Sequence, residues 1–360
     1  MNSDTLHFTC LNKNKTLSFM NMNNSSDSEK VIVTERLCRN FQVRLKAEGL
    51  GASIRNFFKP VHKTVEAVKN LDIEITRGEI IGFLGPNGAG KTTTLKMLSG
   101  LLVPSSGSMR VLGHNPFERQ TDFLKKISLV MGQKQNLWWD LPPLETFAIH
   151  KSIYQIEDNS YKERIDELIS MLEIEDCLQT QTRRLSLGQR MRCELAVSLL
   201  HQPEILFLDE PTIGLDILMQ KKIRSFLLDY HRRFRPTILL TSHYMDDVAA
   251  LAQRVIVIDL GSKIFDGGLR ELTDKIHPDK LISVIFNQLP ADQLIKQIGK
   301  LVFNDGMYFK FRVKRSAVPE IAAKLYSTGQ VADLSIEDPP LEDIMGQLFI
   351  AGASQTKSQP

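Results

Sequence analysis

Residues 85–92 read GPNGAGKT and fit the phosphate-loop pattern GxxxxGK[ST], in which a glycine-rich turn surrounds a phosphate group. The apolar run Ile80–Leu84 predicts a strand before this turn, and Thr93–Leu101 predicts a helix after it, which is the context that the motif requires. The turn's amides and the helix N-terminus would face a β-phosphate, Lys91 would lie between the β- and γ-phosphates, and the Thr92 hydroxyl would face Mg²⁺. The predicted nucleotide-binding residues are Gly85, Pro86, Asn87, Gly88, Ala89, Gly90, Lys91, Thr92 and Thr93.

Two adjacent carboxylates, Asp209 and Glu210, end the apolar run Ile205–Leu208. A buried strand that ends in two carboxylates is costly unless a cation lies nearby, because unpaired buried charge is strongly unfavourable. Mg²⁺ would supply that charge. We expect Asp209 to hold the metal through its water shell and Glu210 to polarise an attacking water. Without a phosphate loop before it, the pair would be better explained as a solvated acidic strand end.

The elements that must position these residues follow an α/β pattern from Val31 to about Leu272. Short apolar runs typical of strands buried on both faces of a sheet alternate with helical stretches. In open α/β sheets, ligands bind at the carboxyl ends of the strands, which is where the polar motifs lie. The predicted buried strands are Ile80–Leu84, Ile205–Leu208, Thr237–Leu240 and Val255–Ile258.

The sequence pattern predicts four segments along the chain. Residues 1–30 are rich in Asn, Ser and Lys and predict a disordered N-terminal tail, and 351–360 predict a second one. Residues 31–275 predict the α/β domain, with a mostly helical subdomain at about 117–200. Residues 276–350 predict a small βαββαβ domain of the ferredoxin-like type, with a hairpin turn at Asn304-Asp305-Gly306 and a further helix near Leu341–Phe349.

Composition excludes several classes of protein. The chain has 360 residues, of which 42% are hydrophobic and 24% charged, a globular composition of about two domains. Its 45 basic and 42 acidic residues give a net charge of +3, so no basic field indicates a nucleic-acid partner. The cysteines Cys10, Cys38, Cys177 and Cys193 form no CxxC pair and predict reduced thiols. No apolar run reaches the 18 residues needed to span a bilayer, and no signal peptide is evident.

Together these motifs resemble the ATP-binding subunit of an ABC transporter, because Leu185-Ser186-Leu187-Gly188-Gln189 stands before Asp209-Glu210. The family's signature is LSGGQ. This sequence keeps its serine (Ser186) and its second glycine (Gly188), but has Leu187 in place of its first glycine. The resemblance implies an α/β fold, a P-loop NTPase ABC cassette with a RecA-like core, an antiparallel β subdomain and a helical subdomain. The small α+β ferredoxin-like C-terminal domain would follow this cassette.

The resemblance also implies roles for residues outside these motifs. Gln133 resembles the glutamine that joins the metal shell and senses the γ-phosphate, so the implied metal-site residues are Thr92, Gln133 and Asp209. His243 resembles the switch histidine that contacts the γ-phosphate and orients Glu210 and the water. The implied catalytic residues are Glu210, His243 and Gln133. Asp216 resembles the loop that crosses to the other monomer.

The aromatic residue that stacks on adenine is less clearly marked. Phe41 lies at the place where the family has this aromatic, and Val43–Thr64 resembles an insertion that contains the rivals Phe57 and Phe58. All three aromatics could instead only pack against their neighbours.

The resemblance implies partners as well as ATP and Mg²⁺. Two copies would sandwich two ATP molecules, with Ser186, Leu187, Gly188 and Gln189 of one copy acting across the dimer. The adjacent Trp138 and Trp139 lie where the family docks a membrane subunit, although both could instead anchor the helical subdomain. We therefore expect a homodimer bound to integral membrane permease subunits, peripheral on the cytoplasmic face of the inner membrane.

The function that these residues favour is an ATPase that powers a separately encoded permease. The sequences of the motifs are similar to those of subunits that serve ABC-2-type permeases, which are often exporters. The alternative is a soluble ABC ATPase that acts on ribosomes or DNA. Members of that kind usually carry two cassettes or long coiled coils, and this sequence has neither, so no nucleic acid is expected. A nonhydrolytic scaffold conflicts with Glu210 and His243.

Overall fold

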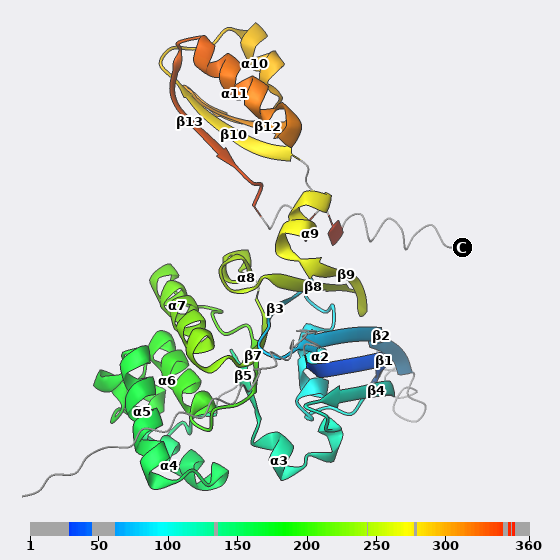
Figure 1. Cartoon of the computed structure of the whole chain (residues 1–360), viewed down its shortest axis with the longest axis vertical. Helices are drawn as coiled ribbons and strands as arrows, with labels where there is room; N and C mark the ends of the chain where they lie inside the picture. The colour runs from blue at the N-terminus through cyan, green and yellow to red at the C-terminus, as the bar shows by residue number, and fades with distance from the viewer. Residues whose placement is uncertain are drawn as a thin grey trace, which may run out of the picture.

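The computed structural model (Figure 1) describes residues 29–44, 62–132, 136–242, 244–276, 279–340, 345–346 and 348–349. Its centre is a six-stranded sheet with the order β5-β6-β7-β3-β8-β9. The first five strands are parallel, and β9 pairs with β8 in the antiparallel sense. The strands are β3 Ile80–Leu84, β5 Ile127–Met131, β6 Ile205–Asp209, β7 Thr237–Thr241, β8 Arg254–Asp259 and β9 Ser262–Gly268. The four predicted buried strands are confirmed.

Helices cover both faces of this sheet, because successive side chains of a buried strand point to opposite sides. On β6, Leu206 and Leu208 pack in one core cluster with helix α6 (Leu187–Leu199), helix α7 (Ile217–Phe234) and helix α5 (Asp158–Leu172). Ile205 and Phe207 pack in another cluster with helix α2 (Lys91–Leu98). Helices α2 and α6 therefore lie on opposite faces of the sheet, as Figure 1 also shows.

The region at 117–200 is helical only in part. Strand β5 lies within it and belongs to the central sheet, which the sequence did not predict. The short helix α3 (Thr121–Leu124) precedes β5. The long helices of this region begin only with α4 (Pro143–Tyr154), which is followed by α5 and α6. Single-turn 3₁₀ segments are η1 Pro116–Glu118, η2 Glu175–Cys177, η3 Thr182–Arg184 and η4 Arg315–Ala317.

A second, antiparallel sheet has the order β2-β1-β4. Its strands are β1 Lys30–Arg44, β2 His62–Thr76 and β4 Ser106–Val111. Both ends of the stretch 43–64 belong to the β1–β2 hairpin, in which Arg44 lies opposite His62. Apolar side chains of this sheet share the core cluster of α2, so the two sheets are packed around that helix.

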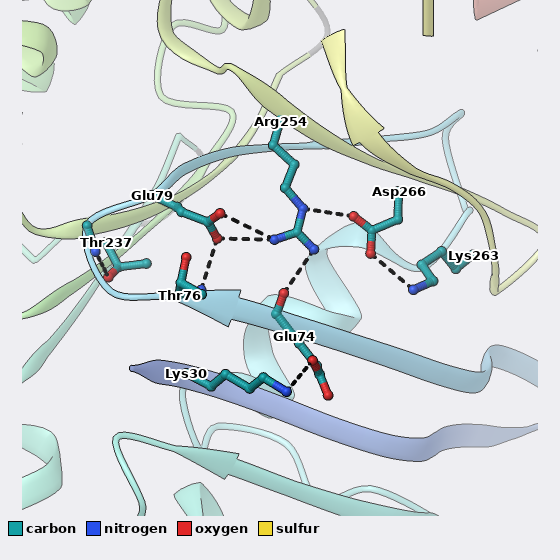
Figure 2. A network of polar contacts seen from close by, with 9 residues as sticks. Lys30, Glu74, Thr76, Glu79, Thr237, Arg254, Lys263 and Asp266 are labelled. Carbon is teal, nitrogen blue, oxygen red and sulfur yellow. Dashed lines mark hydrogen bonds and ion pairs between the residues drawn. The ribbon is translucent and has the colours of Figure 1, made fainter. Parts of the chain in front are cut away.

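Arg254, at the start of β8, links the two sheets through its guanidinium group (Figure 2). Its Nε donates to Asp266 Oδ1 on β9 (2.9 Å) and its NH1 to Glu79 Oε2 just before β3 (3.1 Å). Its NH2 donates to the backbone carbonyl of Glu74 on β2 (3.0 Å). Glu79 also accepts the backbone N–H of Thr76 (2.9 Å). One arginine therefore connects β2 to three neighbouring segments of the central sheet.

The C-terminal part forms a four-stranded antiparallel sheet with the order β11-β12-β10-β13. Its elements are β10 Asp279–Phe286, α10 Asp292–Ile298, β11 Lys300–Asp305, β12 Tyr308–Lys314, α11 Val318–Ser327 and β13 Val331–Glu337. The βαββαβ order is confirmed, and helices α10 and α11 share a core cluster with the sheet. The hairpin turn falls at Gly306 and Met307 rather than at Asn304-Asp305-Gly306.

Helices α8 (Met245–Leu251) and α9 (Leu269–Ile276) lie beside the central sheet, toward the C-terminal domain (Figure 1). Helical residue Met345 is buried in the same cluster as Val248 of α8 and Leu272 of α9, so the chain returns here after β13. The remainder of the helix predicted at Leu341–Phe349 lies partly outside the described residues, as do both predicted disordered tails. Among the helices of the described ranges, none is both long and apolar enough to cross a membrane.

We predict that Arg254→Met lowers the free energy of unfolding by about 2 kcal/mol, because the partly buried carboxylate of Glu79 would lose its arginine donor and that of Asp266 would keep only its contact with Lys263. Denaturant unfolding of the purified chain measures this difference. The matched control is Arg232→Met, which removes an exposed ion pair with Asp229 and should change stability by less than about 0.5 kcal/mol. Equal stability of the two variants would contradict a role for Arg254 in joining the sheets.

Candidate active site

The phosphate loop connects the end of β3 to the start of α2 and lies against the β1–β2 hairpin. Gly90, the N-cap of α2, has a φ of 104°, a left-handed conformation that favours glycine. A Cβ at this position would lie 2.3 Å from the carbonyl oxygen of Ala67 on β2. The loop is therefore tightly packed under β2, and only glycine fits at residue 90.

Lys91 is folded back over the loop that precedes it. Its Nζ donates to the carbonyl oxygens of Gly85 (2.7 Å) and Pro86 (3.0 Å). Burial lowers the pKa of Lys91, and the nearby carboxylates of Glu210 and Asp209 oppose that shift. Lys91 thus places a buried ammonium between the loop carbonyls and the acidic end of β6.

Asp209 joins three elements of the site. Its side chain is largely buried, with 8% of the residue exposed. Its Oδ2 accepts a hydrogen bond from Thr92 Oγ1 at the start of α2 (2.8 Å), and its Oδ1 accepts one from Thr241 Oγ1 at the end of β7 (2.7 Å). Two of the three residues predicted to bind Mg²⁺, Thr92 and Asp209, are therefore in contact.

Glu210 has an unusual backbone conformation. Its φ is 55°, in the left-handed region, which costs a non-glycine residue about 1–3 kcal/mol unless its surroundings impose it. Its N–H donates both to the carbonyl and to the hydroxyl of Thr241, each at 3.1 Å. On its other side, a Cβ at Gly132 would lie 2.5 Å from the Glu210 carbonyl oxygen. Contacts with β7 and with the end of β5 therefore hold the turn that carries Glu210.

The signature residues form the N-terminus of α6. Ser186 is the N-cap: its hydroxyl accepts the Gln189 N–H (3.2 Å), while Gln189 Oε1 accepts the Ser186 N–H (3.0 Å). Ser186 and Leu187 are exposed. Asp216 caps α7 in the same way, by accepting the N–H of Met219 (2.9 Å). The signature and the crossing loop thus both present capped helix ends to solvent.

The aromatic candidates for adenine stacking are only partly within the described residues. Phe41 is half-buried on β1 and lies opposite Val65 of β2. Val65 comes two residues before Ala67, whose carbonyl lies over Gly90. The Arg39 guanidinium lies 4.6 Å from the centre of its ring. Phe41 is thus near the phosphate loop along the hairpin. Outside the described residues lie Phe57, Phe58, Gln133 and His243.

Trp138 and Trp139 are both on the surface, with 54% and 50% of each residue exposed. Arg190 directly follows the signature in sequence. Its guanidinium lies 4.9 Å from the centre of the Trp139 ring. The neighbouring Leu137 is the residue that enters the core cluster. The tryptophan pair therefore leaves about half of its apolar area in water.

Two family models match the chain. The model for ABC transporters matches residues 68–213, and the model for the C-terminal domain of EvrA-like ABC transporters matches residues 278–337. The ABC transporter ATP-binding protein NatA of Bacillus subtilis is 32% identical over 64% of this chain and 94% of its own length. The Nod factor export ATP-binding protein I of Cupriavidus metallidurans is 34% identical over 78% of this chain and 91% of its own length. The daunorubicin resistance ATP-binding protein DrrA3 of Streptomyces coeruleorubidus is 32% identical over 78% and 90%.

The chain belongs to the ABC transporter ATP-binding proteins. Solved structures of similar fold include an ATP-binding subunit of an ABC transporter (TM-score 0.56, 19% identity, 68% of this chain and 92% of that chain). They also include a dimeric post-hydrolysis state of the cassette MJ0796 with ADP and Pi (TM-score 0.55, 23% identity, 66% and 99%). The predicted ABC cassette fold is confirmed, and the protein is an ATPase of this family.

Sequence reasoning missed two residues of this ABC subunit that contact the site or its neighbouring loop. Gly132 lies against Glu210, where a Cβ would come within 2.5 Å of the Glu210 carbonyl oxygen, and it had no sequence signal because strand β5 before it was not predicted. Glu194 lies on α6, two turns after the signature, where its side chain is buried among apolar residues. Its Oε1 accepts the N–H of Asn136 (2.6 Å) and its Oε2 accepts the N–H of Leu137 (3.2 Å). Glu194 therefore ties the signature helix to the segment that precedes the tryptophan pair.

We predict that Glu194 makes stability depend on pH. Burial raises the pKa of Glu194 from 4.5 to about 7, although its backbone hydrogen bonds act in the opposite direction. The folded protein thus binds this proton more tightly than the unfolded chain does, so its stability falls as pH rises from about 4.5 to about 7. Glu194→Gln keeps a hydrogen-bond acceptor without the charge. Between pH 5 and 8, it should gain about 2–3 kcal/mol relative to the parent protein.

Denaturant unfolding at several pH values measures this gain. The control is Glu163→Gln, which removes an exposed carboxylate from α5. A Glu194→Gln difference from the parent that stays constant with pH would show that Glu194 does not titrate in this window.

Proposed function

We propose that the protein powers export through a separately encoded permease of the ABC-2 type, peripheral on the cytoplasmic face of the cell membrane. The names of two relatives support export, because they refer to Nod factor export and daunorubicin resistance. The observation that carries the proposal is the contact between Thr92 and Asp209, which unites a phosphate loop with an acidic strand end. In this proposal, residues 31–275 form the ATPase cassette and 276–350 form the C-terminal domain.

The proposed nucleotide site lies at the carboxyl ends of β3, β6 and β7. Thr92 and Asp209 present adjacent oxygen atoms, the donor type that Mg²⁺ prefers, so this pair fits the metal that accompanies ATP. Bound Mg²⁺ would offset negative charge on the phosphates. Lys91 would turn from the loop carbonyls to the β- and γ-phosphates, and Phe41 would stack on adenine.

Glu210 is proposed to accept a hydrogen bond from the attacking water and orient it toward the γ-phosphate. Its position directly after Asp209 supports this role, because the left-handed turn holds a second acidic residue next to the proposed metal-binding one. His243 and Gln133 are proposed to complete the site around the γ-phosphate. Both follow the ends of central-sheet strands, β7 and β5 respectively.

A homodimer is proposed to assemble two complete sites. Helix α2 begins at the phosphate loop and helix α6 begins at the signature, and they lie on opposite faces of the central sheet. This arrangement supports a site in which Ser186 and Gly188 of one copy face the phosphate loop of the other. ATP would then bind the closed dimer more tightly than the open one. ATP binding would therefore close the dimer, and hydrolysis would open it.

The permease is proposed to dock beside the tryptophan pair. A groove of about 440 Å³ opens between β5, α4 and α6, and its lining includes Leu101, Asn136, His150, Ile153 and Tyr154. Leu101 and Ile153 are exposed by 53% and 61%, so the groove continues an apolar surface. Its mixed apolar and hydrogen-bonding lining suits a short helix of a membrane subunit.

We predict that Lys91→Ala and Glu210→Gln separate nucleotide binding from hydrolysis. Lys91→Ala should lose most of its affinity for ATP, whereas Glu210→Gln should bind ATP, hydrolyse it at least 100-fold more slowly and accumulate as a dimer. Nucleotide binding, phosphate release and size-exclusion chromatography in MgATP measure these effects. Lys96→Ala on the same helix is the matched control for Lys91→Ala. Full turnover in both site variants would refute the assignment.

For the docking surface, we predict that Trp138→Ala and Trp139→Ala lose copurification with the membrane protein encoded by a neighbouring gene. Each substitution removes half-exposed aromatic area of the kind that dominates protein interfaces. Affinity purification of the coexpressed pair measures the loss, with ATP binding as the test of correct folding. Tyr326→Ala, on the exposed side of α11, is the control and should copurify normally. Unchanged association of the tryptophan variants would assign both residues a structural role.

A further inference from the structure

Asp247 of α8 is a buried carboxylate that none of the sequence motifs includes. Only 1% of the residue is exposed. Its Oδ2 accepts hydrogen bonds from the hydroxyls of Thr212 and Ser242, the latter at 2.8 Å. Its Oδ1 accepts one from NH1 of Arg224 on α7, at 2.6 Å. Three segments that are far apart in sequence therefore meet at one side chain.

Each of these contacts is adjacent to a proposed site residue. Thr212 follows Glu210 by two positions, and its residue is 2% exposed. Ser242 is the last described residue before position 243, and its hydroxyl also accepts the N–H of Tyr244 (3.0 Å). Arg224 belongs to the helix that Asp216 caps. Asp247 thus connects the turn after Glu210 with α7, the helix that Asp216 caps. It also connects this turn with Ser242 and, through Ser242, with Tyr244, the two residues that flank position 243.

The turn of Glu210 is constrained from both sides. Its left-handed backbone persists only if its neighbours impose it. On the N-terminal side, Thr241 accepts the Glu210 N–H through its carbonyl and its hydroxyl. On the C-terminal side, the Thr212 hydroxyl is bound to Asp247. Removal of the acceptor at Asp247 would leave the Thr212 hydroxyl without this partner, and the turn would keep on this side the bond from the Ile213 N–H to the Glu210 carbonyl (3.2 Å).

Burial of charge distinguishes this contact from ordinary packing. The Asp247 and Arg224 side chains are 1% and 11% exposed, so the ion pair is almost fully removed from water. Apolar residues of similar volume often stabilise such a position as well as a buried ion pair does. What the carboxylate adds is direction, because each donor must approach one of its two oxygen atoms.

We propose that Asp247 is a positioning residue for ATP hydrolysis, which fixes the turn after Glu210 relative to the Ser242 segment and α7. The proposal rests on the proposed role of Glu210 with the attacking water. Asp247 acts through Thr212 and Ser242, so its loss should affect the rate of the chemical step more than the binding of ATP.

The test is steady-state ATP hydrolysis by Asp247→Asn, with ATP affinity measured separately in the absence of turnover. Asparagine keeps the volume, but loses the charge and one acceptor oxygen. We expect kcat to fall at least 10-fold, while the affinity for ATP changes less than twofold. The stability control is Ile223→Val, beside Arg224 on α7, which loosens the core and should leave kcat unchanged. An Asp247→Asn kcat within twofold of the parent, or an equal fall in kcat and affinity, would overturn the proposal.

Two further variants keep the test decisive if Asp247→Asn does not fold. Thr212→Val and Ser242→Ala each remove one hydroxyl donor and leave the ion pair in place. Each should lower kcat at least fivefold without weakening ATP binding, and parental rates in both would overturn the proposal. Glu210→Gln separates this outcome from failure of the proposed function. If Glu210→Gln abolishes hydrolysis while the Asp247 network variants hydrolyse normally, only the positioning role is wrong.

Discussion

The burial of carboxylates at the end of a parallel sheet is the constraint on which the site depends. A carboxylate removed from water must find donors, and Asp209 finds them in two threonines, Thr92 of α2 and Thr241 of β7. These contacts need α2, β6 and β7 in one arrangement, because hydroxyl donors reach only about 3 Å. The phosphate loop therefore cannot shift relative to the acidic strand end without leaving a buried carboxylate unsatisfied. The apolar packing of both sheet faces and the backbone pairing of β6 with β7 bring these polar side chains within reach of one another.

The same constraint recurs at two other buried acids, each of which joins different segments. Glu194 connects α6 to the backbone of Asn136 and Leu137, and Asp247 connects α7, α8 and the turn after Glu210. The two carboxylates differ in the donors that they contact. Asp247 has an arginine partner, whereas the contacts of Glu194 are backbone amides, and burial raises the pKa of Glu194 to about 7. The first therefore provides a buried ion pair, and the second provides a link whose strength depends on protonation.

The sequence predicted those parts of the fold that have a short-range signal. The runs in β3, β6, β7 and β8 are mainly apolar, and those in β6, β7 and β8 end in polar residues, so their type could be inferred for all four and their place at the site for these three. Strand β5 was missed because its five residues include Ser128 and stand within a helical pattern, so only pairing with β6 identifies it. Contacts between distant residues had no such signal. Cys177 and Cys193, which look scattered in sequence, have sulfur atoms 3.5 Å apart in the fold.

The departure from the family signature at Leu187 has a physical explanation in the same chain. A Cβ at Gly214 would lie 3.1 Å from Leu187 Cδ2, and one at Gly188 would lie 3.0 Å from Met219 Cε. The signature turn thus packs against the turn that leads into α7, and the small residues Gly188 and Gly214 leave room for the larger side chains. A glycine at 187 would leave the first contact empty. Leucine instead packs the signature against the turn that leads into α7.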